Sequence, residues 1–234
     1  MCKEGLIIEF NELRSIEIIK GTEFVSIVKD GKAKKYKIVD TTEKLIGYLS
    51  KSTDYLEKQV GILVTCECIN IAGIFHNAIF LEKFKIDSYS DPPIDDLLYL
   101  SFSNCDFFQD IELLGGDYKR IKINESIIRK NLFIRFVNCE KLRGNNITFK
   151  ENIILENSEF GSFNVNASKI EDNLLFQEVN ILNDFILDKV KGNKDLDFID
   201  CRFEGLSKLE LDISGELNFC NAPFIKNQKL ILTK

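Results

Sequence analysis

The sequence lacks several residue types on which catalysis and metal binding commonly depend. It contains no tryptophan, one methionine, 3 prolines and one histidine in 234 residues. A single histidine leaves little material for histidine-based catalysis or for a histidine-rich metal site. With only 13 glycines and 3 prolines, the chain is also not collagen-like.

Long apolar runs are absent too. No uninterrupted stretch approaches the roughly 18 apolar residues that a membrane helix needs, and the run from Leu6 to Ile8 is too short for a signal-peptide core. The 7 cysteines are an odd number and do not have the spacing of a disulfide framework. We therefore expect a cytoplasmic protein that neither spans nor binds a membrane.

The charge balance is acidic, with 31 Lys and Arg against 37 Asp and Glu and a net charge of −6. Because proteins that bind duplexes normally carry a basic face, this balance argues against direct nucleic-acid binding. Hydrophobic residues make up 44% of the chain and charged residues 29%, which is typical of a folded globular protein rather than of a disordered one.

Residues 1–60 predict a small α+β segment. Short strands are expected over 6–10, 15–19, 23–28 and 35–39, and Asp30-Gly31 is a tight-turn dipeptide between the last two. Apolar residues recur at helical spacing after Thr41, which predicts a helix that breaks near Ser52. This segment either caps the rest of the chain or forms a separate binding module.

From residue 61 onward, the chain repeats one frame. A large apolar residue is followed by a polar residue two positions on, a small residue three positions on and another large apolar residue five positions on. The frames begin at Phe75, Phe102, Ile123, Leu155, Phe176, Phe198 and Phe219, with a partial copy at Phe136. Most successive starts keep a constant spacing, and a second apolar column keeps step at Leu113, Val165, Leu187, Leu209 and Leu230. A fixed period of this size, about 21 residues, predicts a solenoid, and the lack of a helical period predicts β rather than α units.

We therefore predict a mainly β fold, a β-solenoid over 61–234 with coils of about 21 residues, preceded by the α+β cap at 1–60. Phenylalanine, which occurs 19 times, is expected to fill the interior. Small residues are expected to stack at a tight corner, at Ala78, Cys105, Ser126, Ser158, Cys201 and Ala222. One coil cannot bury its own apolar face, so stability is expected to come from stacking.

The frame is irregular in two places. The interval from Phe75 to Phe102 is longer than one period, and the extra length includes the stretch from Tyr89 to Asp96 with its two prolines, which predicts an extruded loop. The interval from Ile123 to Leu155 is longer still. Either a coil carries an insertion around residues 129–131, or one turn is irregular.

The segments from Phe102 to Phe107 and from Phe219 to Phe224 resemble the pentapeptide-repeat family, since large apolar residues five apart bracket a small one. The resemblance covers about residues 70–230. It implies a right-handed, four-sided β-helix; the longer period of this chain keeps a more general right-handed β-helix open. The family has no common catalytic residues, so the resemblance implies no active site.

The extruded loop is the best candidate for a partner-binding site, because long loops on rigid scaffolds often carry function. Its candidate residues are Tyr89, Asp91, Asp95 and Asp96. These acids lack the ligand spacing of a calcium loop. We therefore expect no metal, no cofactor and no catalytic residue.

The cysteines predict packing rather than chemistry. Cys66 and Cys68 lie on one face if their segment is a strand, but no second pair or histidine accompanies them. Cys105, Cys139 and Cys201 occupy the small-residue position, where a free thiol packs as a small hydrophobe.

The leading functional hypothesis is a non-catalytic protein-binding scaffold that uses the solenoid face and the inserted loop. One alternative follows from the resemblance, since some pentapeptide-repeat proteins imitate duplex DNA and bind DNA gyrase; residues 61–234 carry 20 basic and 27 acidic residues, which fits in sign. A second alternative is a β-helix carbohydrate-active enzyme. Its candidate outward acids are Glu156, Glu178, Asp200 and Glu210.

The carboxyl end of the solenoid is expected to be open, because the strand at 229–234 is followed by no helix or polar cap. Open strand edges pair readily with other chains. We expect a homodimer through this end, another partner chain, or a longer natural protein. The composition, rich in Ile, Lys and Asn, suggests a bacterial source.

Overall fold

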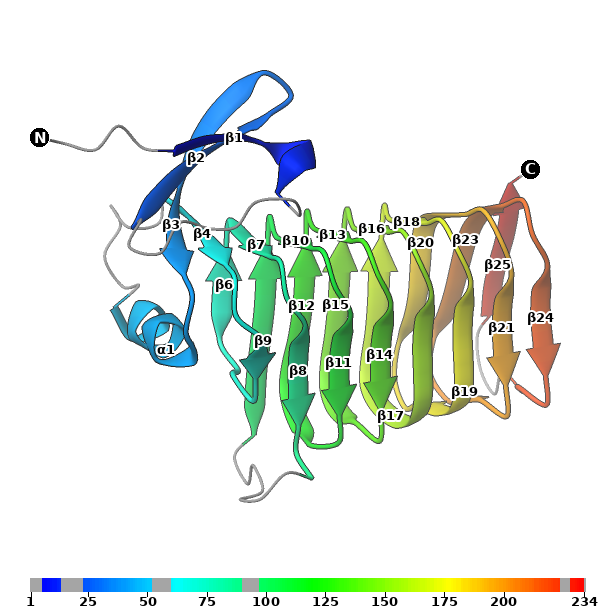
Figure 1. Ribbon diagram of the computed structural model, residues 1–234. Coiled ribbons are helices and arrows are strands. Elements are labelled where there is room, and N and C mark those ends of the chain that lie inside the picture. The colour runs from blue at the N-terminus through cyan, green and yellow to red at the C-terminus, as the bar shows by residue number, and fades with distance from the viewer. Residues whose placement is uncertain (1–5, 14–22, 52–59, 90–96, 224–227, 234) are drawn as a thin grey trace, which may run out of the picture.

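Figure 1 shows one continuous stack of β-coils, with the amino-terminal elements at one end and the carboxyl terminus at the other. The computed structural model describes residues 6–13, 23–51, 60–89, 97–223 and 228–233. Strands account for 62% and helices for 6% of the structure, and the stack has about 9 turns of about 21 residues. The predicted mainly β solenoid with a small amino-terminal cap is therefore confirmed.

The secondary-structure elements follow one another in a regular order. The amino-terminal elements are β1 (Leu6–Glu9), the 3₁₀ turn η1 (Phe10–Glu12), β2 (Phe24–Lys29), β3 (Lys32–Val39) and α1 (Thr42–Lys51). The coils contain β4 (Gly61–Val64), β5 (Cys68–Ile69), β6 (Ile74–His76), β7 (Ala78–Phe80), β8 (Phe84–Asp87), β9 (Leu98–Ser103), β10 (Asp106–Phe107), β11 (Ile111–Leu114), β12 (Asp117–Asn124), β13 (Ile127–Ile128), β14 (Leu132–Arg135), β15 (Asn138–Asn145), β16 (Thr148–Phe149), β17 (Ile153–Asn166), β18 (Lys169–Ile170), β19 (Leu174–Ile181), β20 (Phe185–Gly192), β21 (Leu196–Ile199), β22 (Arg202–Phe203), β23 (Ser207–Ile213), β24 (Leu217–Cys220) and β25 (Gln228–Thr233).

Each coil has two long faces, joined by shorter segments. Face 1 is the stack β6, β9, β12, β15, β17, β20, β23 and β25, and face 2 is the stack β5, β8, β11, β14, β17, β19, β21 and β24. The long strand β17 contributes its amino half to face 2 and its carboxyl half to face 1. Neighbouring coils pair in parallel, so that one position of face 2 is occupied in turn by Ile111, Leu132, Ile153, Leu174, Leu196 and Leu217. Because side chains alternate along a strand, every second residue enters the interior.

Phenylalanine rings from successive coils stack in this interior. The rings of Phe80 and Phe107 lie 4.6 Å apart with an interplanar angle of 1°, and those of Phe198 and Phe219 lie 4.9 Å apart. Fully burying a phenylalanine contributes about 1.5–3 kcal/mol. A ring is covered only when the next coil lies on it, so the coils stabilise one another.

The long interval between Ile123 and Leu155 is neither an insertion nor an irregular turn, so both expectations were wrong. Ile123 lies on face 1, whereas Leu155 lies on face 2. Each coil carries the repeated frame twice, once per face, so the long interval is simply one and a half coils. Residues 129–131 form an ordinary turn between β13 and β14. The small residues that were predicted to stack at one tight corner likewise lie at two different corners of the coil.

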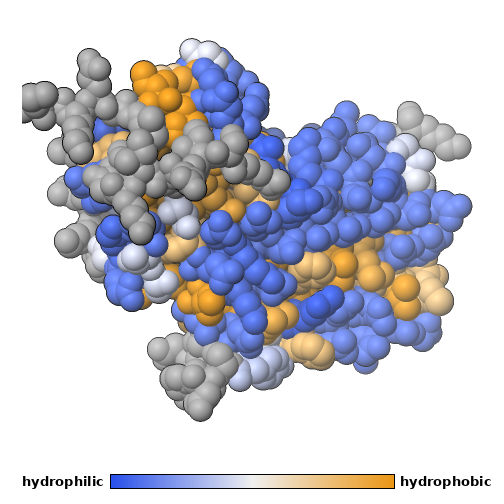
Figure 2. Space-filling model, viewed as in Figure 1, coloured by the Kyte–Doolittle hydropathy of each residue, from blue (hydrophilic) through white to orange (hydrophobic). Residues whose placement is uncertain are grey.

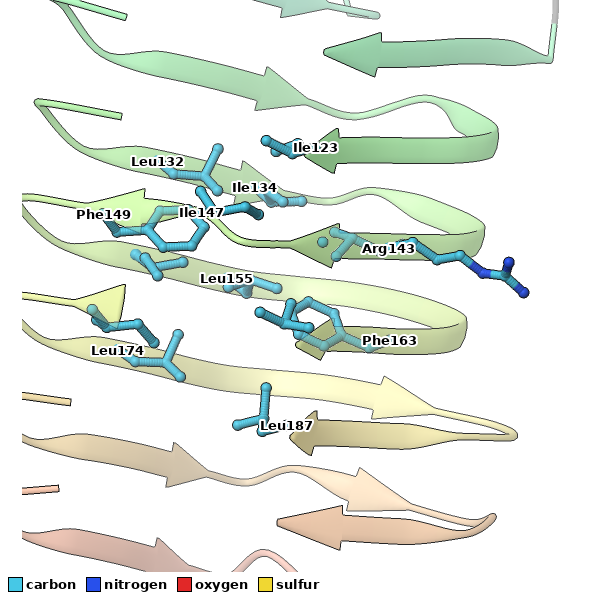
Figure 3. A pocket seen from close by; sticks show the side chains of 15 residues that line it. Ile123, Leu132, Ile134, Arg143, Ile147, Phe149, Leu155, Phe163, Leu174 and Leu187 are labelled. Atoms are coloured by element: carbon cyan, nitrogen blue, oxygen red, sulfur yellow. The ribbon is translucent and has the colours of Figure 1, made fainter. Parts of the chain in front are cut away.

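One coil departs from the packing pattern and leaves an apolar cavity of about 30 Å³ (Figure 3). The neighbouring coils place Ile123 and Val165 at the interior position that Gly144 occupies here. Ile147 stands where several other coils carry a small residue, and its Cδ1 lies 2.6 Å from where a Cβ on Gly144 would be. Ile147 therefore fills most of the volume that the glycine leaves. The apolar lining offers a water none of the two to four polar partners that it needs.

The amino-terminal elements cover the first coil. Strand β3 pairs in parallel with β4, so the β2–β3 hairpin joins the stack directly. Asp30 and Gly31 have φ of 52° and 72°, as the predicted two-residue turn requires. Leu45 of α1 is buried in the solenoid core. The strand predicted at 15–19 lies outside the described residues, and the division at residue 60 stays a prediction.

A partly buried cluster of charges around Asp106 connects the hairpin to the side of the stack. Arg129 donates to the two carboxylate oxygens of Asp106 at 2.6 and 2.9 Å, and Lys29 of β2 donates to the same carboxylate at 3.4 Å. The Arg129 guanidinium also lies 4.7 Å from the centre of the Phe108 ring and 5.1 Å from that of Phe10. This cluster joins the hairpin to the coils through charge and packing together.

Candidate functional site

Each coil bends at two corners, and at each corner one residue adopts the left-handed backbone conformation. We call corner 2 the column at the end of face 2, with positive φ in every member: Gly115, Phe136, Asn157, Glu178, Asp200 and Asn221. Asparagine and glycine tolerate this conformation, whereas a bulky side chain such as that of Phe136 is strained in it. The side chains of corner 2 project from the coils as a single row.

A groove of about 490 Å³ runs along corner 2. Its lining consists of Phe136, Val137, Asn138, Asn157, Ser158, Glu159, Glu178, Asn180 and Asp200. Three of these residues are acidic, three are asparagines and one presents an aromatic ring, so the groove offers hydrogen-bond acceptors, amides and an apolar contact. We call it the acidic groove.

The acids of the groove are not neutralised by the described part of the chain. None of Glu159, Glu178 and Asp200 forms an ion pair with a described lysine or arginine. Asp200 accepts a hydrogen bond from Asn221 Nδ2 at 2.6 Å. The next outward column differs, because Glu156 lies 2.6 Å from Nε of Arg135. The groove therefore presents net negative charge to a ligand.

Two exposed aromatic rings mark the amino-terminal end of the groove. Phe136 is 53% exposed and Tyr89 is 70% exposed, and their ring centroids lie 6.4 Å apart. Gly115 makes room for this pair, since a Cβ there would lie 2.6 Å from the Tyr89 ring. An exposed ring held in a strained backbone conformation is a feature that clusters at binding sites.

An apolar stripe lies beside the groove on face 2. It consists of the outward residues Phe133, Ile154 and Leu175, which are in register and partly exposed. Figure 2 shows hydrophobic residues in a row across an otherwise hydrophilic surface. The Arg135 guanidinium lies 4.8 Å from the centre of the Phe133 ring, between the stripe and corner 2. The stripe and the acidic groove thus form one continuous surface with an apolar and an acidic side.

The loop residues singled out from the sequence are only partly placed. Tyr89 lies at the described edge of the loop and contacts the groove through Phe136. Asp91, Asp95 and Asp96 lie outside the described residues. Their part in partner binding stays a prediction.

The outward acids considered for catalysis separate into different environments. Glu178 and Asp200 are consecutive members of corner 2, whereas Glu156 is in the paired column next to it. Glu210 lies on face 1, 3.3 Å from the Lys208 ammonium. Phe136 and Glu159 were not predicted as site residues. The predicted frame start at Phe136 was wrong: the frame begins at Ile134, and Phe136 takes the position two residues on, where other coils carry asparagine.

The cysteines offer little reactive chemistry. Cys66 lies in a bend rather than in a strand, so the predicted shared strand face with Cys68 was wrong. Burial raises the pKa of Cys68 to about 12, and it raises the pKa of Cys139 and Cys201 to about 11. Thiols so far from ionisation at neutral pH are poor nucleophiles and metal ligands.

Within the described residues, no group of three or more His, Cys, Asp or Glu side chains is arranged to hold a metal ion. No helix in the described part of the chain is long and apolar enough to cross a membrane.

Comparison with known protein families, curated proteins and solved structures finds no match to this chain. A function for this chain is therefore inferred from its fold and from the chemistry of its surface.

Proposed function

We propose that this chain is a non-catalytic protein-binding scaffold whose binding surface is the acidic groove together with the adjoining apolar stripe. The observation that carries the proposal is the set of unpaired acids, Glu159, Glu178 and Asp200, beside exposed apolar side chains. A rigid solenoid supports such a surface without needing the partner to order it. The inserted loop borders the surface at Tyr89.

The partner that fits this surface is an extended segment with apolar side chains next to lysine or arginine. Apolar anchors would cover Phe133, Ile154 and Leu175, and cations would lie in the groove. Aromatic anchors usually dominate such interfaces, so Phe136 is expected to contribute more than any single carboxylate. The carboxylates would mainly set specificity and the association rate.

The test selects binding peptides from a random library and measures their affinity for variants. E159Q/E178Q removes two groove charges, and E82Q/E125Q removes two exposed acids elsewhere as the matched control. Selected peptides should combine basic and apolar residues, and the groove variant should bind them about 2- to 30-fold more weakly, as loss of two exposed ion pairs predicts. Equal binding by both variants, or peptides without basic residues, would contradict the proposal.

A carbohydrate-active enzyme is the second candidate, and one observation favours it. Glu178 and Asp200 occupy the same corner position in adjacent coils, which are about 4.8 Å apart, and retaining glycosidases hold two carboxyl groups about 5–5.5 Å apart. Polysaccharide hydrolysis that E178Q abolishes would favour the enzyme over the scaffold.

The DNA-mimic alternative has less support. Along the turn between the short strands and face 2, lysines alternate with acids, as in the pairs of Lys150 with Glu171 at 2.8 Å and of Lys194 with Asp172 at 2.8 Å. A DNA mimic needs an uninterrupted acidic row. The relationship to pentapeptide-repeat proteins is also a proposal, supported by the corner geometry in which a small residue follows the left-handed one, as in Asn104-Cys105.

A further inference from the structure

Five basic side chains gather on face 1, next to the short segment of the coil that carries the groove residue Asn138. They are Lys119, Arg120, Lys122, Lys141 and Arg143, and we call them the basic patch. They belong to β12 and β15 in consecutive coils, where Lys122 and Arg143 are direct neighbours in register. Adjacent coils lie about 4.8 Å apart. The fold therefore stacks positive charges that are a whole coil apart in the sequence.

The patch is uncompensated within the described structure. Fifteen ion pairs join described residues, and none includes a member of the basic patch. The exposed acids Asp117 and Glu140 border it without pairing with it. Figure 3 shows the Arg143 side chain pointing away from the interior. Like charges at this spacing repel each other, and a bound anion would relieve the repulsion.

The surroundings of the patch indicate what kind of anion fits. Tyr99 pairs with Arg120 across the strands and is 36% exposed, with the Arg120 guanidinium 5.8 Å from its ring centre. Along the same face, two exposed or partly exposed asparagines, Asn124 and Asn145, add amide donors and acceptors. Cations that follow a phosphate backbone next to an aromatic ring are typical of single-strand binding, whereas an acidic peptide has no use for the ring.

We infer that the basic patch binds single-stranded nucleic acid, with phosphates on the five cations and one base on Tyr99. The patch covers two coils and so contacts only a few phosphates. A flexible single strand can bring those phosphates to it, while a rigid duplex would bring the rest of its charge against an acidic protein. This inference rests on face 1 and is independent of the proposed protein-binding surface.

The experiment titrates the full chain into a fluorescently labelled oligodeoxythymidine of 12 nucleotides and follows anisotropy at 50 and 200 mM salt. With four to five phosphate contacts, affinity should fall roughly 50- to 130-fold between these concentrations. K141Q/R143Q should bind more weakly and lower the slope of log affinity against log salt by about 1.4, or 0.7 per contact. The control K32Q/K189Q removes two exposed lysines elsewhere and should match the wild type.

Two further measurements decide between ligands. Y99L should weaken oligonucleotide binding about fivefold or more, because it removes the stacking ring. Poly-glutamate that binds the patch as tightly as the oligonucleotide, or a duplex that binds more tightly, would overturn the single-strand assignment. Absence of oligonucleotide binding at 50 mM salt, or equal binding by the wild type and K141Q/R143Q, would overturn the site itself.

Discussion

Replacing Phe136 with asparagine separates the two roles that an exposed ring in a solenoid corner can have. If the ring supports the coil, the substitution should destabilise the protein. If the ring is held outward for a partner, stability should barely change while binding is lost. Asparagine is the informative replacement because other coils already place it in the left-handed position, as at Asn157 and Asn221.

The expected change in the free energy of unfolding follows from two opposing contributions. The Phe136 side chain is 53% exposed, so of the about 1.5–3 kcal/mol that full burial contributes, roughly half, about 0.7–1.4 kcal/mol, is lost. Against this, a φ of 56° strains a bulky residue, by roughly 1–2 kcal/mol, and asparagine relieves much of that strain. The two contributions nearly cancel, and the net change should be within about 1 kcal/mol.

The assay is urea denaturation followed by circular dichroism, since the chain has no tryptophan. The control is Phe160→Asn, because the Phe160 ring is fully buried and its loss should cost about 3–5 kcal/mol. Phe136→Asn should also abolish binding of the selected peptides. A loss of more than about 2 kcal/mol in Phe136→Asn, well beyond the burial that the ring has, would refute the reasoning and make the ring a structural element.

The interior and the ion pairs support three more predictions. Ile147→Ala should cost about 2–5 kcal/mol by enlarging the cavity, and G144I/I147A should recover most of it by restoring the packing of the neighbouring coils; an equally unstable double variant in urea denaturation would contradict the compensation. A maleimide at pH 8 should label the exposed Cys220 quickly, but Cys105 and Cys201 only after denaturation. Burial raises the pKa of Cys105 to about 12 and that of Cys201 to about 11. Fast labelling of Cys105 or Cys201 in the folded protein would contradict their burial in the interior of the solenoid. Hydrogen bonds from Lys150 and Lys169 lower the pKa of Glu171 below its usual 4.5. The ionised carboxylate therefore stabilises the fold above pH 4.5, and this contribution is lost as the pH falls through the lowered pKa. Glu171→Gln should make the free energy of unfolding depend less on pH in the acid range, and an unchanged dependence would show that the ion pairs contribute nothing.

The solenoid could be predicted because its repeat is carried by large apolar residues, which the interior requires at fixed spacing. The two faces could not be told apart, because the frames at Phe75 and at Phe198 have the same pattern although they lie on opposite sides of the coil. The period alone shows that residues one coil apart stack on one another, but it does not show on which of the two faces they lie. Only the pairing register resolves this, and the register depends on contacts between coils rather than on local sequence.

The two proposed binding surfaces were harder to predict for a related reason. Glu178 and Asp200 are separated by a whole coil in the sequence, and nothing in either neighbourhood marks them as partners. Phe136 had a signal, since it breaks the frame at a position where asparagine is common. The cations Lys122 and Arg143 gave no such signal, because a few basic residues in one strand are ordinary and their alignment across two coils appears only in the pairing register. Surface chemistry in a solenoid is set by residues one coil apart, which local motifs do not capture.

The same arrangement explains why the net charge of −6 is a poor guide to what this protein binds. Glu178 and Asp200 lie two and three coils beyond Arg143, which is about 10–14 Å along the stack at the usual strand spacing. The Debye length at physiological ionic strength is about 8 Å, so the acids there are largely screened from the basic patch. A ligand therefore responds to the charges of the coils that it touches rather than to the total. Two surfaces of opposite charge can thus act independently on one stack, and substitution of Glu178 or Asp200 should leave binding at the basic patch unchanged.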